Sequence, residues 1–193
     1  AALTVSQVAQ FTAPQIERNR QLQATRTITA VLPGITYNNE PALDVTEVVD
    51  ADLLGSTEPL QVYTARQDGR PVAYAITAVA PAGYVGPMRL LVGVAADGSV
   101  LAVRALEHRE TPGLGDQIER ERSAWISVFD GLNAAAASQP DWSLQTDGGR
   151  FDQLSGATIT SRAVVRAVGK ALEFFRAGES QLARVELVTE PDQ

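Results

Sequence analysis

The sequence has 193 residues, of which 45% are hydrophobic and 20% are charged, and this balance is typical of a globular domain with its own core. Its formal net charge of −7 argues against DNA or RNA as a partner, because an acidic surface repels a phosphate backbone. The lack of cysteine excludes disulfides, iron–sulfur ligation and a thiol nucleophile, and the single histidine, His108, argues against a histidine-rich zinc site.

The N-terminal segment is predicted to form a helix over residues 13–32. Apolar residues recur there roughly at helical spacing, and Pro33-Gly34 should end the helix. No apolar run approaches the roughly 18 residues that a bilayer span requires, and the first residues have none of the features of a signal peptide.

The middle of the sequence predicts two β-hairpins. The first joins strands over residues 60–66 and 72–79 through a turn that contains Asp68-Gly69. The second joins strands over residues 88–95 and 100–107 through Ala96-Asp97-Gly98-Ser99. An Asp-Gly turn between apolar segments favours antiparallel pairing of consecutive strands.

The C-terminal half is predicted to be mainly helical. Residues 116–129 should form a helix, and residues 133–149 should form an irregular connection. The longest helix should begin near Thr158 or Ile159 and end at Arg176, with one packed side that contains Ala163, Val164, Ala167, Val168, Ala171, Leu172 and Phe175. A short element over residues 180–188 and a frayed tail over residues 190–193 should follow.

These elements together predict the α+β class, with an antiparallel sheet built from hairpins and with flanking helices. No linker or repeat divides the sequence, so it is expected to form a single domain over residues 1–193 that begins with a helix within residues 1–33.

A hydroxyl-rich turn, Asp-Gln-Leu-Ser-Gly-Ala-Thr over residues 152–158, precedes the longest helix. Gly156 and Ala157 leave the backbone open to close approach, and the next turn of helix supplies free N–H groups and the positive end of the macrodipole, which favour a phosphate. Arg162 can add a charge-assisted contact. The spacing is not that of a P-loop. The simpler alternative is that Ser155 or Thr158 only caps the helix.

A second segment, His-Arg-Glu-Thr-Pro-Gly-Leu-Gly-Asp over residues 108–116, follows the last predicted strand. Pro112 favours an extended conformation at Thr111, and the two glycines allow unusual dihedral angles. Tyr84 lies in a separate loop beside Gly83 and Gly86, which should keep that loop open to a ligand. Composition alone is equally compatible with ordinary loops.

The D-x-x-S-G-A-T pattern of residues 152–158 resembles the flavinylation motif of FMN-binding domains in ion-pumping respiratory complexes. With the E-T-P-G-L-G pattern of residues 110–115, the chain is similar to the G subunit of the Rnf electron-transport complex over about residues 24–175. The related C subunit of the sodium-pumping NADH:quinone reductase shares both patterns, but the H-R-E-T-P-G-L-G-D form and the short chain favour the Rnf subunit. The resemblance implies FMN joined covalently, through a phosphoester, to Thr158.

The resemblance also implies an electron carrier that transfers no chemical group itself and needs no catalytic or metal-ligating residue. Glu110 is expected either to face the edge of the flavin ring or to accept hydrogen bonds within its own turn. Asp152 is expected to be recognised by the flavin transferase, to fix the turn, or both. The candidate cofactor-binding residues are Thr158, Ser155, Gly156, Ala157, Thr160, Ser161, Glu110, Thr111, Gly113, Leu114, Tyr84 and Asp152.

The family implied by the resemblance sits at the cell inner membrane. Its soluble domain lies on the periplasmic side and follows an N-terminal membrane anchor, which is expected to have been removed from this chain. The implied partners are the other subunits of the ion-translocating Rnf complex and, during maturation, a flavin transferase that cleaves FAD.

Two functions of other classes remain open. One is a periplasmic module that binds a phosphorylated ligand reversibly through residues 155–161. The other is a hydrolase that uses Ser155 or Thr158 as nucleophile and His108 as base, although no G-x-S-x-G elbow supports it. A histidine at the end of a strand, as His108 is, is more often a surface residue without a proton-transfer role.

Overall fold

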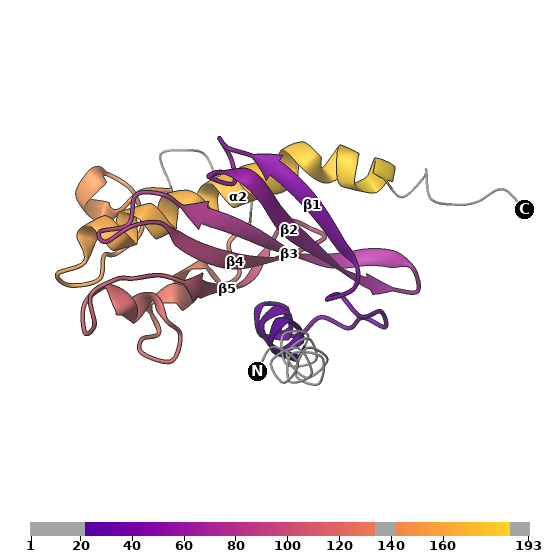
Figure 1. Ribbon diagram of the computed structural model, residues 1–193, viewed down its shortest axis with the longest axis horizontal. Coiled ribbons are helices and arrows are strands. Elements are labelled where there is room, and N and C mark those ends of the chain that lie inside the picture. Colours follow the sequence, from indigo (N-terminus) through magenta and orange to yellow (C-terminus); the bar gives the residue numbers. More distant parts are fainter. Residues whose placement is uncertain (1–21, 134–141, 186–193) are drawn as a thin grey trace, which may run out of the picture.

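In the described residues, 22–133 and 142–185, five strands form one antiparallel sheet in chain order (Figure 1). The computed structural model places α2 (Thr158–Val185) across one face of this sheet and a helix over residues 22–31 on the other. The strands are β1 (Val45–Asp50), β2 (Ser56–Gln67), β3 (Arg70–Ala80), β4 (Met88–Ala95) and β5 (Val100–Glu107). The predicted α+β class is confirmed.

Both predicted hairpins are present. β2 and β3 pair in antiparallel register up to Gln67 and Arg70, and the two residues between them, Asp68 and Gly69, both have positive φ, as a type I′ turn requires. β4 and β5 have the predicted bounds, and Gly98 in their turn has a φ of 83°. Local turn chemistry therefore accounts for the pairing of β2 with β3 and of β4 with β5.

The edge strand β1 was not predicted from the sequence. Its residues alternate between exposed and half-buried, and none is fully buried, because β1 has a neighbour on one side only among the described residues. Val45 and Val49 are exposed. An edge strand without a buried face lacks the apolar periodicity by which strands are recognised.

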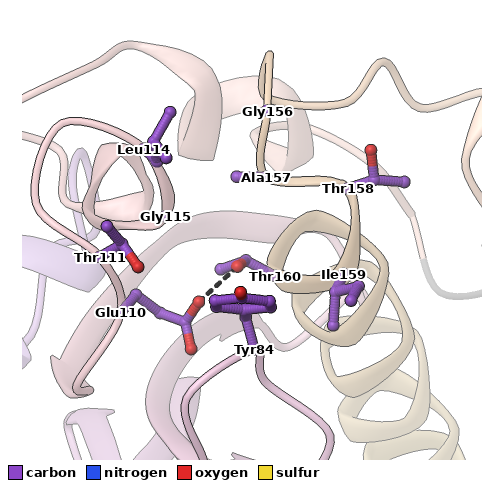
Figure 2. A pocket seen from close by; sticks show the side chains of 10 residues that line it. All are labelled: Tyr84, Glu110, Thr111, Leu114, Gly115, Gly156, Ala157, Thr158, Ile159 and Thr160. Atoms are coloured by element: carbon purple, nitrogen blue, oxygen red, sulfur yellow. Dashed lines mark hydrogen bonds between the residues drawn. The ribbon is translucent and has the colours of Figure 1, made fainter.

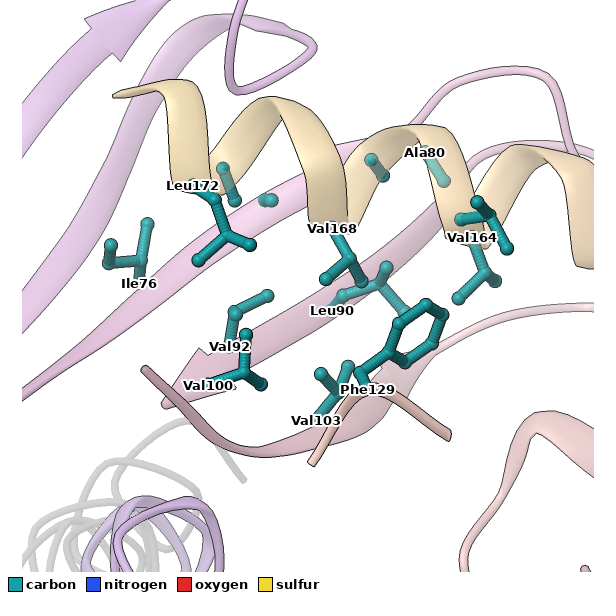
Figure 3. Packing of buried hydrophobic residues seen from close by; sticks show 14 of the residues in the cluster. Ile76, Ala80, Leu90, Val92, Val100, Val103, Phe129, Val164, Val168 and Leu172 are labelled. Atoms are coloured by element: carbon teal, nitrogen blue, oxygen red, sulfur yellow. The ribbon is translucent and has the colours of Figure 1, made fainter. Parts of the chain in front are cut away.

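The sheet is buried on both faces, and this explains the nearly continuous apolar sequence of β3 and β4. On one face the larger core includes residues of α2 above residues of the central strands (Figure 3): Val164, Val168 and Leu172 above Ile76, Leu90 and Val92. On the other face Ile28, Val31 and Leu32 pack on a smaller set that includes Ala73, Ala75 and Leu91. All seven apolar residues predicted for the packed side of the longest helix are buried.

Gly93 in β4 explains how closely the helix over residues 22–31 approaches the sheet. A Cβ atom at this position would collide with the backbone carbonyl of Val31. Only glycine permits this approach, so a substitution at Gly93 must move the helix away from the strand.

The predicted helix over residues 116–129 is wrong. Two short 3-10 helices, η1 (Gly115–Ile118) and η2 (Trp125–Phe129), stand in its place. Glu119 has extended dihedral angles, and the hydroxyl of Ser123 accepts the N–H of Trp125 at 3.1 Å. In a helix that N–H would bond to the carbonyl four residues earlier, so the serine side chain competes with helical pairing. The apolar residues still point inward, and Ile118, Ile126 and Phe129 are buried.

Near the chain ends, the outcome of the predictions is mixed. The helix before Pro33-Gly34 ends at residue 31, one residue earlier than predicted, and residues 13–21 lie outside the described part. α2 begins at Thr158 as predicted but continues to Val185. The prediction of a separate element from residue 180 is therefore wrong for residues 180–185. Residues 186–193 lie outside the described part.

The connection over residues 133–149 is irregular where it is described, with one short turn of helix, η5 (Gln145–Asp147).

Candidate functional site

Three segments that are distant in sequence meet around one cavity of about 450 Å³ (Figure 2). They are the loop after β3, the segment from the end of β5 into η1, and the N-terminus of α2. The lining residues are Tyr84, Glu110, Thr111, Leu114, Gly115, Gly156, Ala157, Thr158, Ile159 and Thr160. The cavity therefore brings together the two motifs singled out in the sequence and the separate Tyr84 loop.

The start of α2 forms one wall of the cavity. The backbone N–H of Ser161 bonds to the carbonyl of Ala157 at 3.0 Å, so the amides of Thr158, Ile159 and Thr160 have no acceptor within the helix. These amides and the positive end of the macrodipole suit a phosphate group. Gly156, with a φ of 74°, makes the left-handed turn into the helix, and its α-carbon faces the side chain of Leu114.

The four hydroxyls of this segment have different surroundings. Thr160 is 1% exposed and donates to a carboxylate oxygen of Glu110 at 2.5 Å. Ser161 is fully buried; its hydroxyl donates to the carbonyl of Ala157 and accepts the N–H of Leu154, both at 3.0 Å. Ser155 is exposed and is not among the lining residues. Thr158 lines the cavity, is half-buried, and its hydroxyl has no partner among the described residues.

Glu110 connects the three segments. Its carboxylate is 5% exposed and accepts the Thr160 hydroxyl on one oxygen and the backbone N–H of Val85, at 3.1 Å, on the other. Of the two roles expected for Glu110, hydrogen bonding to backbone is therefore present, although the N–H comes from the Val85 loop and not from its own turn.

Two glycines leave space for the Glu110 side chain. A Cβ atom on Gly115 would lie 2.7 Å from Oε2 of Glu110 and 3.0 Å from the hydroxyl of Thr160. A Cβ atom on Gly83 would lie 2.9 Å from Oε1 of Glu110. Both distances are shorter than ordinary van der Waals contact. A residue with a Cβ atom at either position would therefore press on the carboxylate, and glycine leaves room for it.

The remaining candidates in the second motif lie at the cavity or next to it. The carbonyl of Thr111 accepts the N–H groups of Leu114 and Gly115, each at 3.1 Å, and so closes the turn. Gly113 has a φ of 79° but is not among the lining residues, and a Cβ atom there would meet open space. Tyr84 is 66% exposed at the mouth of the cavity.

Asp152 lies outside the cavity, on the exposed start of its motif. Its side chain accepts only the adjacent N–H of Gln153, at 2.9 Å, among the described residues. Its backbone carbonyl accepts Nε1–H of Trp125 at 2.8 Å. The backbone of the motif is thus anchored from η2, while the carboxylate remains accessible.

Arg162 does not point to the cavity. It forms a two-bond ion pair with Asp147 of η5, at 2.5 and 2.8 Å, and its guanidinium holds the pKa of Asp147 below the ordinary value. The phosphate contact expected for Arg162 is absent from this arrangement, and the helix amides remain as the groups suited to an anion.

His108 belongs to a polar cluster beside the cavity. Its Nδ1 accepts the N–H of Glu110 at 3.2 Å, and its Nε2 lies 3.0 Å from Oε1 of Glu119. Arg122, and to a smaller extent His108, lower the pKa of Glu119, although partial burial acts in the opposite direction. Both ring nitrogens are therefore engaged away from Ser155 and Thr158, and the geometry offers no histidine–hydroxyl pair for a hydrolase.

Gly115 and Ile159 line the cavity but were not among the predicted site residues. Gly115 lies within the E-T-P-G-L-G pattern and Ile159 directly follows Thr158, so proximity to the motifs was the available signal. The side chains described form no cluster suited to a metal ion, and no described helix is long and apolar enough to cross a membrane.

Comparison with known proteins agrees with this geometry. The sequence profile of the FMN-binding domain matches residues 83–173, which include all three segments of the cavity. The G subunit of the ion-translocating oxidoreductase complex of Vibrio cholerae is 45% identical over 89% of this chain and 82% of its own length. The corresponding subunits of Shewanella loihica and Pseudomonas aeruginosa are each 43% identical over 92% of this chain and 84% and 83% of their own lengths.

A solved structure has a similar fold. NqrC of Shewanella oneidensis superposes with a TM-score of 0.51 and 21% identity over 76% of this chain and 75% of NqrC. At this level of identity the similarity concerns the fold alone.

Proposed function

The chain belongs to the G-subunit family of the ion-translocating oxidoreductase complexes, and from this premise we propose that it is an electron-transfer subunit that carries FMN as a phosphoester on Thr158. The family membership favours the Rnf-type subunit over the C subunit of the sodium-pumping NADH:quinone reductase. When bound, FMN would supply one- and two-electron transfer, and the residues that line the cavity would hold and orient it.

The cavity fits FMN in size and in the chemistry of its wall. Its volume of about 450 Å³ lies in the range of small-molecule sites. Tyr84, Leu114 and Ile159 offer apolar surface to a planar ring, and the free amides at the start of α2 suit a phosphate. No lysine or arginine is among the lining residues in the described part of the chain, so the helix terminus is the main source of positive potential.

The proposal rests on the different burial and hydrogen bonding of the hydroxyls in residues 155–161. Attachment requires an oxygen that can be reached from outside and that can form a bond to phosphorus. Thr160 and Ser161 are buried and hydrogen-bonded, and Ser155 lies outside the cavity. Within residues 155–161, Thr158 is the hydroxyl that lines the cavity without another partner among the described residues; Thr111 of the second motif also lines the cavity.

The proposal also covers the location of the protein in the cell and its partners. We place it in a membrane-bound ion-translocating complex, with its soluble domain on the periplasmic side of the inner membrane and with the other subunits as partners. A flavin transferase would load the cofactor from FAD, and the exposed carboxylate of Asp152 is available for recognition by that enzyme.

Mass spectrometry tests the proposal directly. After co-expression with a flavin transferase, the intact wild-type protein should gain the mass of FMN less one water, and peptide mapping should locate it on Thr158. Thr158→Val should abolish the adduct, whereas Ser155→Ala should retain it. A yellow protein that loses all flavin on denaturation would instead support reversible binding of a phosphorylated ligand, and an adduct on Thr160 would overturn the assignment to Thr158.

A further inference from the structure

Glu110 places a negative charge in the cavity wall without a positive partner. Buried carboxylates in proteins are usually paired with a cation. Glu110 is 5% exposed, yet in the described residues it is held only by two neutral donors, the Thr160 hydroxyl and the Val85 N–H. The nearby cluster of Asp116, Glu119, Arg122 and His108 pairs within itself.

The Glu110 side chain is held at both oxygens. One oxygen bonds to the Thr160 hydroxyl and the other accepts the backbone N–H of Val85. Gly115 packs against the carboxylate from one side and Gly83 from the other. The charge is therefore fixed in position, and little water can reach it to screen its field.

Resting on the proposed function, we propose that Glu110 lowers the reduction potential of the flavin bound in this cavity. One electron added to oxidised flavin without a proton adds one negative charge, and two electrons added with one proton also add one. A fixed negative charge in the cavity wall opposes either change, because like charges repel more strongly where water is excluded. In a titration the electrons come from an electrode or from a chemical reductant such as dithionite.

Glu110→Gln removes the carboxylate but can keep the hydrogen bonds that this side chain makes. The amide oxygen of glutamine can accept the Val85 N–H, and its NH2 group can donate to the oxygen of Thr160, so both connections can persist without the charge. Midpoint potentials of flavin-loaded protein, measured by spectroelectrochemical titration, should be higher in Glu110→Gln than in wild type. Glu110→Asp, which keeps the charge, should remain closer to wild type.

Asp116→Asn provides a matched control. Asp116 is also buried, at 3% exposure, and lies six residues further along, but it is not among the lining residues and sits 3.0 Å from Nη1 of Arg122. Its neutralisation should leave the flavin potential unchanged. An equal rise in Asp116→Asn would contradict a local effect of Glu110.

The outcomes separate this inference from the proposed function. Wild-type protein without covalent flavin would overturn the proposed function and the inference with it. Loaded Glu110→Gln with the potential of wild type would overturn the inference alone. If Glu110→Gln accepts no flavin, Thr160→Val decides: it keeps the charge and removes a donor that offsets it, so the potential should fall, and an unchanged or higher potential would refute the role of Glu110.

Discussion

The hydroxyl of Thr160 donates a hydrogen bond of 2.5 Å to the carboxylate of Glu110, and this bond joins two motifs that lie 50 residues apart in the chain. Both side chains are almost completely buried. Each motif therefore fixes the position of the other, and the stability of the site should depend on this contact.

Thr160→Val should lower the free energy of unfolding by about 1–3 kcal/mol, because it leaves a buried carboxylate oxygen without its donor. Urea denaturation measures the change. Thr158→Val, whose hydroxyl has no partner among the described residues, should change the stability of the unloaded protein by only about 0.5 kcal/mol or less. Equal losses in the two variants would show that the Thr160–Glu110 bond adds no stability.

Gly115→Ala should disturb the site more than Gly113→Ala. The new methyl group at Gly115 would press on Glu110 and Thr160, so both stability and flavin loading should fall. Gly113 faces open space, and alanine there should cost only the strain of its positive φ, about 1–2 kcal/mol. Thermal unfolding and the ratio of flavin to protein distinguish the two effects. Normal loading in Gly115→Ala would argue against the packing described here.

Ser161→Ala should destabilise the motif, because the Ser161 hydroxyl holds the N–H of Leu154 as well as donating to Ala157. The loss of these two buried hydrogen bonds should cost about 1–3 kcal/mol in urea denaturation. Exposed Ser155 is the matched control, and Ser155→Ala should have an effect near zero.

Asp152→Asn should reduce flavin loading with little effect on folding. The carboxylate is exposed and accepts only a hydrogen bond from the next residue, which an asparagine oxygen can replace. Intact mass after co-expression with a flavin transferase reports loading, and the thermal midpoint reports folding. Full loading at normal stability would leave Asp152 without a role in recognition.

Glu119 should make the free energy of unfolding depend on pH in the acid range. Its pKa in the folded protein is lowered from 4.5, chiefly by Arg122. A lowered folded-state pKa means that Glu119 stabilises the fold above pH 4.5, and that this contribution is lost as the pH falls through the folded-state value. Urea denaturation above and below pH 4.5 should show a shallower acid decline for Glu119→Gln than for wild type. Glu121→Gln, at an exposed neighbour, should follow the wild-type curve.

The sequence by itself determined the features that depend on neighbouring residues. The Asp-Gly turns predicted both hairpins because positive φ is a local requirement, and helical spacing from Ala163 to Phe175 predicted the buried side of α2. Two short patterns indicated the family, which the relatives confirmed. The motif also singled out Thr158 before any geometry was known.

Only the tertiary structure decided the rest, because it depends on contacts between distant segments. Over residues 116–129 the apolar spacing is helical, yet the chain forms two short 3-10 helices, and Trp125 donates to the backbone carbonyl of Asp152 in a distant segment. β1 has no buried face and so no apolar pattern, and it forms by pairing with β2. The sequence shows Thr158 and Thr160 as two similar hydroxyls. The fold makes them different, because the carboxylate that binds Thr160 comes from a loop that local spacing does not connect to it.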